Sequence, residues 1–250
     1  MSCLFYCISH NPGPELAGPL SGVAGRPVYQ VADRRLRAAV SVINRADLTP
    51  DLPRVRAYER VVSSYHRRGT VVPMRYGCVV EQESQVIEML SAQGSHYEAL
   101  LQELDGCVEM GLRVLLPSGP WAGVTPGGPE GSREVAEPYP PDPGAAIDRL
   151  GLAYLTARKA HYAHQDRWTK EYRQAADRCQ AQFATLFVKC KTEAPSSRLP
   201  LLSLYFLLPR SAVELFRQAF RQLTETEPAR LLLSGPWPPY NFVTACPSLW

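Results

Sequence analysis

Four charged residues in otherwise apolar segments are the side chains best suited to acid–base chemistry. Glu109 and Arg113 are four residues apart in an expected strand, so their side chains point to the same face of it. Glu59 falls in an expected helix and Arg75 in another expected strand. The four residues could form a general acid–base set, or a buried or half-buried ion-pair network that holds two domains together. We favour the ion-pair network.

Two histidines provide the only spacing that suits a metal ion. His161 and His164 lie three residues apart in a helical region and could present two imidazoles to one ion. No carboxylate or cysteine at a useful spacing completes the ligand set, which favours an exposed pair of histidines. The sequence has no G-x-G-x-x-G, G-x-x-x-x-G-K-[ST], G-x-S-x-G or H-E-x-x-H motif. We therefore expect no catalytic residue, no cofactor and no metal.

The cysteines are odd in number and include no C-x-x-C pair. Cys3 and Cys7 are four residues apart, which places them on the same face of a regular strand, where a redox pair is conceivable. In a reducing compartment such scattered cysteines are more often small buried apolar residues, and we favour that interpretation. The seven are Cys3, Cys7, Cys78, Cys107, Cys179, Cys190 and Cys246.

The net charge of +3 is arranged in blocks, with basic segments at 26–75 and 151–250 on either side of an acidic segment at 76–150. A nucleic-acid binder usually carries a sustained basic excess, whereas these blocks can neutralise one another within the fold. One helical region does combine basic and aromatic residues, and we interpret it as a solvated helix face. Its members are Arg158, Lys159, Arg167, Trp168, Lys170, Tyr172, Arg173 and Arg178.

The composition, 45% hydrophobic and 20% charged, is typical of a folded protein. No stretch approaches eighteen uninterrupted apolar residues, so we expect no membrane span. The apolar start of the chain lacks a basic segment and a long apolar core, which favours a first strand over a signal peptide. We therefore expect a cytosolic protein.

The hydrophobic periodicity predicts an α+β fold. Two of the expected helices have identifiable N-termini: Ser95 would cap the second part of a helix broken near Gly94, and Ser211 with Glu214 would form a capping box. The expected strands are Cys3–Ser9, Leu36–Ile43, Thr70–Val79, Gly106–Leu116, Phe183–Cys190, Leu199–Leu208 and Arg230–Ser234, and the expected helices are Pro53–Arg68, Ser84–Leu104, Ala145–Phe183 in at least two pieces, and Ser211–Thr224.

The order of these elements predicts two domains. From Gly106 onward it is strand, helix, strand, strand, helix, strand, which is the βαββαβ order of a ferredoxin-like domain with extra helix in its first crossover. We therefore expect an N-terminal α+β domain at 1–105, a ferredoxin-like domain at 106–236 and a C-terminal tail at 237–250. A proline- and glycine-rich segment at 117–144 should be a mobile loop inserted in the second domain.

The tail carries more apolar surface than a free, solvated segment would. Pro238 and Pro239 favour polyproline II, in which Trp237, Tyr240 and Val243 would line one side. Such a tail could dock on the chain's own domain junction as a clasp or be offered to an apolar partner. We favour the clasp, with Trp237 and Tyr240 largely buried, because an exposed apolar tail invites aggregation.

The stretch from Leu231 to Val243, LLLSGPWPPYNFV, closely resembles the C-terminal signature of the GvpF/GvpL family of gas vesicle proteins. Weaker matches follow in the family's order at 4–6 (LFY), 38–41 (AAVS), 58–61 (YERV), 70–77 (TVVPMRYG), 106–114 (GCVEMGLRV) and 151–159. The residues that we single out as its structural or interaction motif are Glu59, Arg75, Glu109, Arg113, Gly235, Pro236, Trp237, Pro238, Pro239, Tyr240, Asn241 and Phe242.

The sequence departs mildly from the family at three positions, with Tyr58 in place of a usual histidine, Tyr76 in place of phenylalanine and Arg113 in place of a common lysine. These departures leave open whether the chain is GvpF-like or GvpL-like. The resemblance implies a two-domain α+β protein with a ferredoxin-like second domain. It also implies a non-enzymatic, minor gas vesicle component or assembly factor that contacts the main shell protein and other accessory proteins.

The resemblance implies neither a cofactor nor a small-molecule substrate, and we expect no nucleic-acid or membrane partner. Two alternatives stay open on the fold alone, because ferredoxin-like domains include RNA-binding proteins and host many enzymes. A deep polar pocket around Glu109, Arg113 or Arg75 would favour an enzyme. A run of exposed aromatic residues beside basic ones would favour a nucleic-acid-binding regulator.

Overall fold

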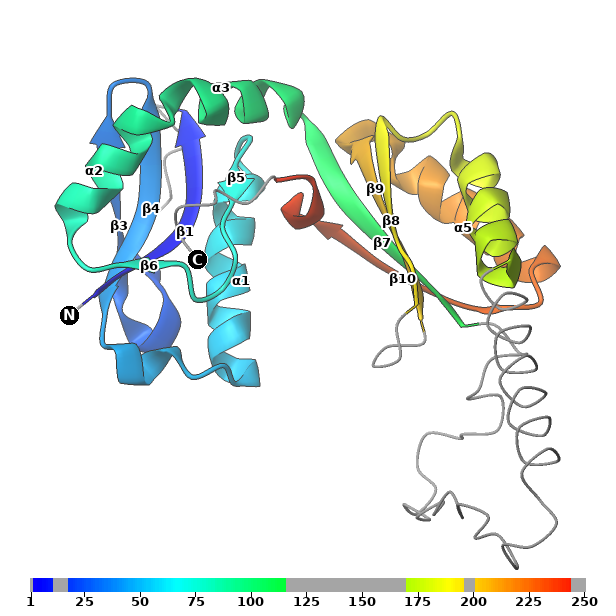
Figure 1. Ribbon diagram of the computed structural model, residues 1–250, viewed down its shortest axis with the longest axis horizontal. Coiled ribbons are helices and arrows are strands. Elements are labelled where there is room, and N and C mark those ends of the chain that lie inside the picture. Colours follow the sequence, from blue (N-terminus) through cyan, green and yellow to red (C-terminus); the bar gives the residue numbers. More distant parts are fainter. Residues whose placement is uncertain (1, 11–17, 116–169, 196–200, 244–250) are drawn as a thin grey trace, which may run out of the picture.

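A computed structural model of the chain describes residues 2–10, 18–115, 170–195 and 201–243. It contains two β-sheets, which lie side by side in Figure 1 and are joined where α3 (Gly94–Glu103) leads into β7 (Cys107–Leu115). The mixed α+β class expected from the sequence is confirmed. Within the described residues, no helix is both long and apolar enough to cross a membrane.

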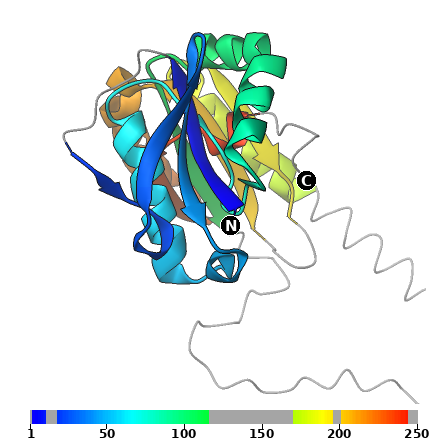
Figure 2. The same ribbon diagram turned by 90° about the vertical axis from the view of Figure 1, so that its left-hand side faces the viewer.

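The first sheet has six strands in the order β2-β3-β4-β1-β5, with β6 also paired to β1. Helix α1 packs on one face, and α2 and α3 pack on the other, as Figure 2 shows. The central strand is therefore buried on both sides, which explains its unbroken apolar run. The elements are β1 (Ser2–His10), β2 (Leu20–Ser21), β3 (Pro27–Asp33), β4 (Leu36–Ile43), α1 (Leu52–His66), β5 (Val72–Pro73), β6 (Val79–Val80) and α2 (Glu83–Ala92).

A bulge in β1 between Phe5 and Cys7 changes which face each later side chain meets. Cys3 packs with Phe5 in the core beneath α2 and α3, whereas Cys7 packs with Tyr6 in the core beneath α1. The prediction that Cys3 and Cys7 share a face is therefore wrong, because the extra residue shifts the alternation by one. All cysteines in the described part of the chain are free thiols, and burial raises the pKa of Cys7 far above its ordinary value.

Local side-chain chemistry sets the helix starts, although not always as expected. The Asp51 carboxylate accepts a hydrogen bond from the backbone N–H of Arg54 at 2.8 Å and caps α1, and Gln82 with Gln85 forms a capping box at α2. The break near Gly94 is confirmed. However, Ser95 does not cap α3, since the chain already turns into the helix at Gln93.

The second sheet has four antiparallel strands in the order β10-β7-β9-β8. A helical segment at 170–183 and α5 cover one face, and their core is centred on Phe183, Phe206 and Phe216. The Phe183 and Phe216 rings stack with their centres 4.1 Å apart. The other face carries no α-helix among the described residues. The remaining elements are β8 (Lys189–Glu193), β9 (Leu202–Pro209), α5 (Val213–Thr226) and β10 (Arg230–Trp237).

Some expected elements differ from the observed ones. Ser211 lies in a short 3-10 turn, η3 (Arg210–Ala212), and makes no cap, because α5 begins only after this turn. The expected strand at 70–79 is two short strands, β5 and β6, on either side of a turn at Gly77, whose φ is +89°. Strands β2 and β3 were not expected from the sequence. The loop at 117–144 and most of the helical region at 145–183 lie outside the described residues.

Candidate interaction site at the C-terminal segment

The chain leaves β10 through a constrained turn. The pairing of β10 with β7 is interrupted between Ser234 and Trp237, and it resumes with Trp237 opposite Glu109. Gly235 occupies this bulge with a φ of +115°, and a Cβ there would lie 2.7 Å from the Glu109 carbonyl oxygen. Only glycine fits this position, and the cis peptide bond to Pro236 follows directly.

After Trp237 the chain folds back on itself. Pro238 and Pro239 are buried, and a 3-10 turn, η4 (Tyr240–Phe242), follows them. The polyproline II prediction is wrong here, because Pro239 has a ψ of 60° and the N–H of Phe242 donates to the Pro239 carbonyl at 3.2 Å. The prediction that Trp237 is buried is also wrong, since its side chain is 40% exposed.

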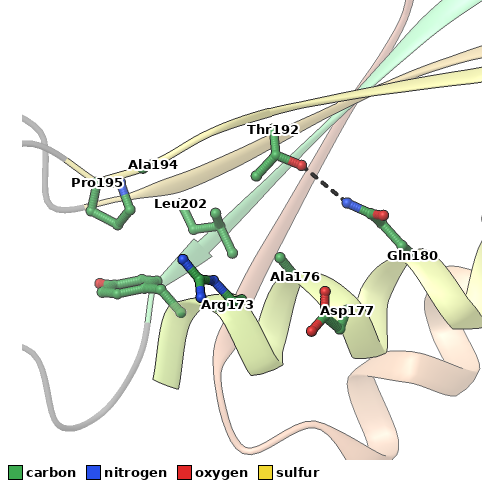
Figure 3. Close-up of a pocket in the computed structure, with 9 residues that line it drawn as sticks. Arg173, Ala176, Asp177, Gln180, Thr192, Ala194, Pro195 and Leu202 are labelled. Carbon is green, nitrogen blue, oxygen red and sulfur yellow. Dashed lines mark hydrogen bonds between the residues drawn. The ribbon is translucent and has the colours of Figure 1, made fainter. Parts of the chain in front are cut away.

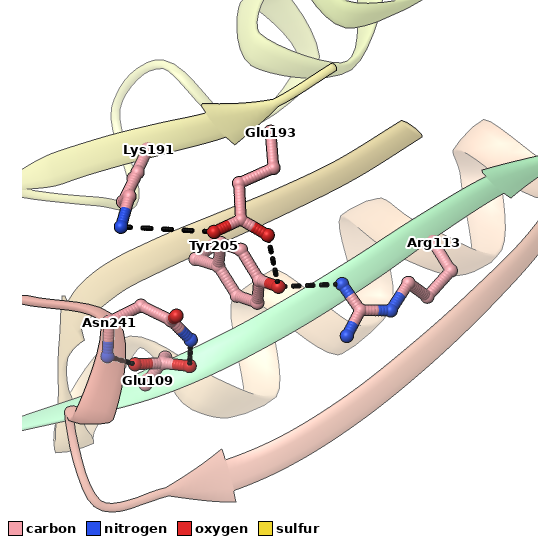
Figure 4. A network of polar contacts seen from close by, with 6 residues as sticks. All are labelled: Glu109, Arg113, Lys191, Glu193, Tyr205 and Asn241. Atoms are coloured by element: carbon pink, nitrogen blue, oxygen red, sulfur yellow. Dashed lines mark hydrogen bonds and ion pairs between the residues drawn. The ribbon is translucent and has the colours of Figure 1, made fainter. Parts of the chain in front are cut away.

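Glu109 holds this segment in place. The residue is only 3% exposed, and its carboxylate accepts a hydrogen bond from the backbone N–H of Asn241 at 2.8 Å and another from the Asn241 side-chain amide at 2.6 Å (Figure 4). Burial raises the pKa of Glu109 above its ordinary value, and the two bonds from Asn241 oppose that rise. The buried carboxylate on β7 therefore accepts hydrogen bonds from both the backbone and the side chain of Asn241.

The residues beyond Pro239 pack on the first sheet. Tyr240 contacts the core beneath α1, and Phe242 and Val243 contact the core beneath α2 and α3. Burial raises the pKa of Tyr240, and the negative charges of the nearby Glu59 and Glu109 carboxylates raise it further. The segment thus leaves the second sheet and ends against the first, as the red trace in Figure 1 shows. The expected docking on the chain itself is confirmed for residues 238–243, and residues 244–250 lie outside the described part.

Arg113 belongs to a second polar cluster on the same open face of the sheet (Figure 4). Its guanidinium donates to the Tyr205 hydroxyl at 2.9 Å, and that hydroxyl donates to Glu193 at 3.0 Å. The Lys191 ammonium lies 3.8 Å from the same carboxylate. Glu109 and Arg113 share a face as expected, but Glu109 is hydrogen-bonded to Asn241 and Arg113 to Tyr205.

Glu59 and Arg75 lie on the first half of the molecule. Glu59, on α1, accepts a hydrogen bond from the Ser63 hydroxyl one turn later. The Arg75 side chain is exposed, and its backbone carbonyl accepts from the Tyr58 hydroxyl at 3.2 Å. The same hydroxyl lies 2.7 Å from the carbonyl of Phe5 and 2.9 Å from that of Met74. Tyr58 therefore joins α1, β1 and the segment after β5, a role that periodicity did not reveal.

A further contact between the halves involves His66, at the end of α1. The Arg210 guanidinium donates to the backbone carbonyl of His66, and the His66 side chain is 5% exposed. Neither ring nitrogen of His66 has a hydrogen-bond partner. Burial and, to a smaller extent, the nearby charge of Arg210 together lower the pKa of His66 to about 3. The imidazole is therefore neutral at physiological pH.

A cavity of about 290 Å³ lies elsewhere, between the helical segment at 170–183 and the ends of β8 and β9 (Figure 3). Its wall includes Arg173, Asp177 and Leu202, and none of the motif residues expected from the sequence contributes to it. Tyr172 is buried in the adjacent core, so the expected basic and aromatic helix face is wrong at that residue. Among the described residues, no group of histidine, cysteine and carboxylate side chains could hold a metal ion; His161 and His164 are outside them.

The chain is thus an α+β protein with two sheets that its C-terminal segment ties together. Its carboxylate and guanidinium motif residues are bonded to neighbouring polar residues, with Glu109 bonded to Asn241, Arg113 to Tyr205 and Glu59 to Ser63. Residues 2–244 match the model of one family, described as gas vesicle synthesis protein GvpL/GvpF. The chain belongs to this family and is therefore a gas vesicle protein. The resemblance to the GvpF/GvpL family that the sequence indicated is confirmed.

Known relatives agree with this assignment. The chain is 26% identical to gas vesicle protein F of Streptomyces sp. (strain CB03234), in an alignment that covers 97% of this chain and 100% of the relative. The crystal structure of GvpF from Anabaena sp. PCC7120 superposes with a TM-score of 0.72 at 14% identity, covering 98% of this chain and 97% of that one. GvpF from Microcystis aeruginosa gives a TM-score of 0.68 at 15% identity, covering 96% and 98%.

Proposed function

We propose that the protein is a non-enzymatic accessory factor of the gas vesicle, either a minor shell-associated component or an assembly factor. It would act in the cytoplasm at the forming vesicle and bind the main shell protein and other accessory proteins. The observation that carries the proposal is the family match over residues 2–244, which includes the whole described C-terminal segment. The relatives from Streptomyces, Anabaena and Microcystis are named as gas vesicle proteins, which supports the same role.

We infer that the C-terminal motif divides into residues that hold the fold and a residue that meets a partner. Gly235 and Pro236 form the turn, and Glu109 fixes Asn241 against the sheet. Pro238, Pro239, Tyr240 and Phe242 pack inward, whereas Trp237 is left 40% exposed. A rigidly held, exposed tryptophan is the type of residue that dominates protein–protein interfaces. We propose structural roles for Glu59, Arg75 and Arg113.

The proposed domain division is 1–105, 106–236 and 237–250, with a ferredoxin-like second domain. The sheet order β10-β7-β9-β8 supports it, since strands one to four of a βαββαβ unit would then lie in the antiparallel order four, one, three, two. The contacts of Phe242 and Val243 with the first core support treating the last segment as a separate connector.

Two observations argue against the alternatives. The charged residues that an enzyme would need on β7 are engaged by Asn241 and Tyr205, and they lie on an open sheet face rather than in the cavity of Figure 3. For a nucleic-acid binder, the aromatic residue beside Arg113 is Tyr205, which is buried and hydrogen-bonded rather than available for stacking. A non-enzymatic protein without a nucleic-acid partner is thus the better proposal.

The test uses cells that form gas vesicles, with the gene replaced by an affinity-tagged copy. The tagged wild type should co-purify with the main shell protein, detected by its own antibody, and should support flotation of the cells. Trp237→Ser should lower the melting temperature modestly, because the side chain is partly buried, and should stay folded under the assay conditions but lose most of the co-purified shell protein and the flotation. Leu215→Ser, at an exposed leucine on α5, is the matched control and should behave as wild type. A Trp237→Ser protein that binds and floats normally would contradict the assignment of this residue.

A further inference from the structure

Strand β10 is an apolar edge strand whose outer side is unoccupied among the described residues. It pairs with β7 on one side and ends the sheet on the other. Residues 231–234 read Leu-Leu-Leu-Ser, yet no residue of β10 is buried, and Leu232 is 54% exposed. Strand β9, inside the same sheet, is buried along nearly its whole length. The exposure of β10 therefore comes from its position at the edge.

The opposite edge of the sheet is protected in the usual way, and β10 is not. Strand β8 carries Lys189, Lys191 and Glu193, and charged side chains on an edge strand discourage pairing with another chain. Between Leu231 and Trp237, β10 has no charged residue. It therefore keeps a row of backbone donors and acceptors beside leucine side chains, which is the surface that β-strand addition requires.

The length of the free edge is limited. The bulge after Ser234, and Pro236, which has no N–H, end the regular strand at its C-terminal side. The regular part is therefore Arg230–Ser234, with Leu232 at its centre. An added strand must be short, extended and apolar to match it.

We propose that a second copy of this chain occupies this edge, with the two β10 strands paired antiparallel about a two-fold axis at Leu232. This register places Leu232 opposite its own copy and Leu231 opposite Leu233, so every central pair is apolar. Each Arg230 lies opposite a Ser234, so no like charges face one another. Among the described residues, β10 is itself the exposed apolar strand of matching length, which is why a second copy is the fitting occupant.

This pairing would bury apolar side chains on both faces of the joined sheet. Leu231 and Leu233 are half-buried and pack against the core beneath α5, so pairing brings the helix-covered cores of the two copies together. On the open face the two Leu232 side chains, each 54% exposed, cover one another. The two sheets would form one continuous sheet, and the apolar edge would disappear.

Sedimentation of the purified full chain over a range of micromolar concentrations tests the proposal. The wild type should show a concentration-dependent dimer. Leu232→Lys places two ammonium groups opposite each other at the axis, and it should weaken the dimer by at least about tenfold. Leu215→Lys makes the same change at an equally exposed leucine on α5 and should leave the dimer unchanged. A wild type that is monomeric throughout, or equal effects of the two lysines, would overturn the proposal.

Cross-linking provides a test that does not depend on the tolerance of β10 for lysine. Directly opposed residues of paired strands have Cβ atoms about 4.5–5.5 Å apart, close enough for a disulfide after small adjustment. Under mild oxidation, Leu232→Cys should yield a covalent dimer well above the amount formed by wild type, which carries the native cysteines. Leu215→Cys should not. A Leu232→Cys protein that cross-links no more than wild type would refute this register and the two-fold pairing.

Discussion

The hydrogen bonds between Glu109 and Asn241 connect residues 132 positions apart in the sequence, and they should determine how firmly the C-terminal segment is held. Asn241→Ala removes the side-chain donor at 2.6 Å and leaves the backbone donor at 2.8 Å in place. A hydrogen bond to a charged group contributes about 1.5–3 kcal/mol. We therefore expect Asn241→Ala to lower the free energy of unfolding by about 1.5–3 kcal/mol, measured by urea denaturation followed by circular dichroism.

Asn241→Asp should be more harmful at neutral pH. It removes the same donor and places a second carboxylate beside Glu109, where two charges about 4 Å apart repel by about 4 kcal/mol at an effective dielectric constant of about 20. This repulsion raises the pKa of the pair in the folded protein. The additional loss should therefore be largest at neutral pH and shrink as the pH falls and one carboxylate takes up a proton.

A second substitution should rescue this variant. In the double variant Glu109→Gln/Asn241→Asp, the new amide can donate to the new carboxylate and the like charges are gone. It should be more stable than Asn241→Asp alone by about 2 kcal/mol or more. Glu193→Gln is the matched control, because Glu193 lies on the same sheet face but contacts Tyr205 and Lys191 rather than the segment. If Asn241→Ala matched the wild type, or Asn241→Asp were no worse than Asn241→Ala, the role assigned to this pair would be refuted.

Three further predictions concern the first half of the molecule and use the same unfolding assay. His66, with a pKa of about 3 when folded and about 6.5 when unfolded, binds its proton only in the unfolded chain between these values, so stability should fall as the pH drops through 6.5, by about 3 kcal/mol between pH 7 and pH 4. His66→Phe should remove this acid sensitivity, and His10→Phe, at an exposed histidine, should not. Tyr58→Phe should cost about 1–3 kcal/mol because buried carbonyls lose their donor, whereas Tyr76→Phe, whose hydroxyl has no partner, should be neutral or better. Gly22→Ala should cost about 1–3 kcal/mol, because its Cβ would meet the Tyr6 hydroxyl oxygen at 2.1 Å, while Gly94→Ala, in the open first turn of α3, should stabilise by about 0.5–1 kcal/mol.

The family, the α+β class and most of the helices and strands follow from the amino-acid sequence alone. The stretch from Leu231 to Val243 resembles the signature of the gas vesicle family, and the family match over residues 2–244 agrees with it. Apolar periodicity located α1 and α5, because burial of one helix face imposes a period on the order of the residues. Nearly unbroken apolar runs located the buried strands β1, β7 and β9. The break at Gly94 also followed from the sequence, since glycine interrupts a helical pattern.

Strand β3 shows where this reasoning fails. It lies near the edge of the first sheet, with only Val31 buried, so its polar and apolar residues do not alternate clearly. The bulge in β1 is a second case, because a single extra residue sends Cys3 and Cys7 to opposite cores without changing the composition of the strand. Both features depend on neighbouring strands and cannot be read from one segment.

The candidate site likewise follows partly from the sequence and partly from the tertiary structure. The sequence supplied its members, including Glu109, Asn241 and Trp237. The folded arrangement specifies that Glu109 accepts hydrogen bonds from Asn241, that Pro238 and Pro239 are buried, and that Trp237 is partly exposed. The hydrophobicity of a side chain determines only how much free energy its burial contributes. Which partner buries it is fixed by register, bulges and chain turns that bring together residues distant in the sequence.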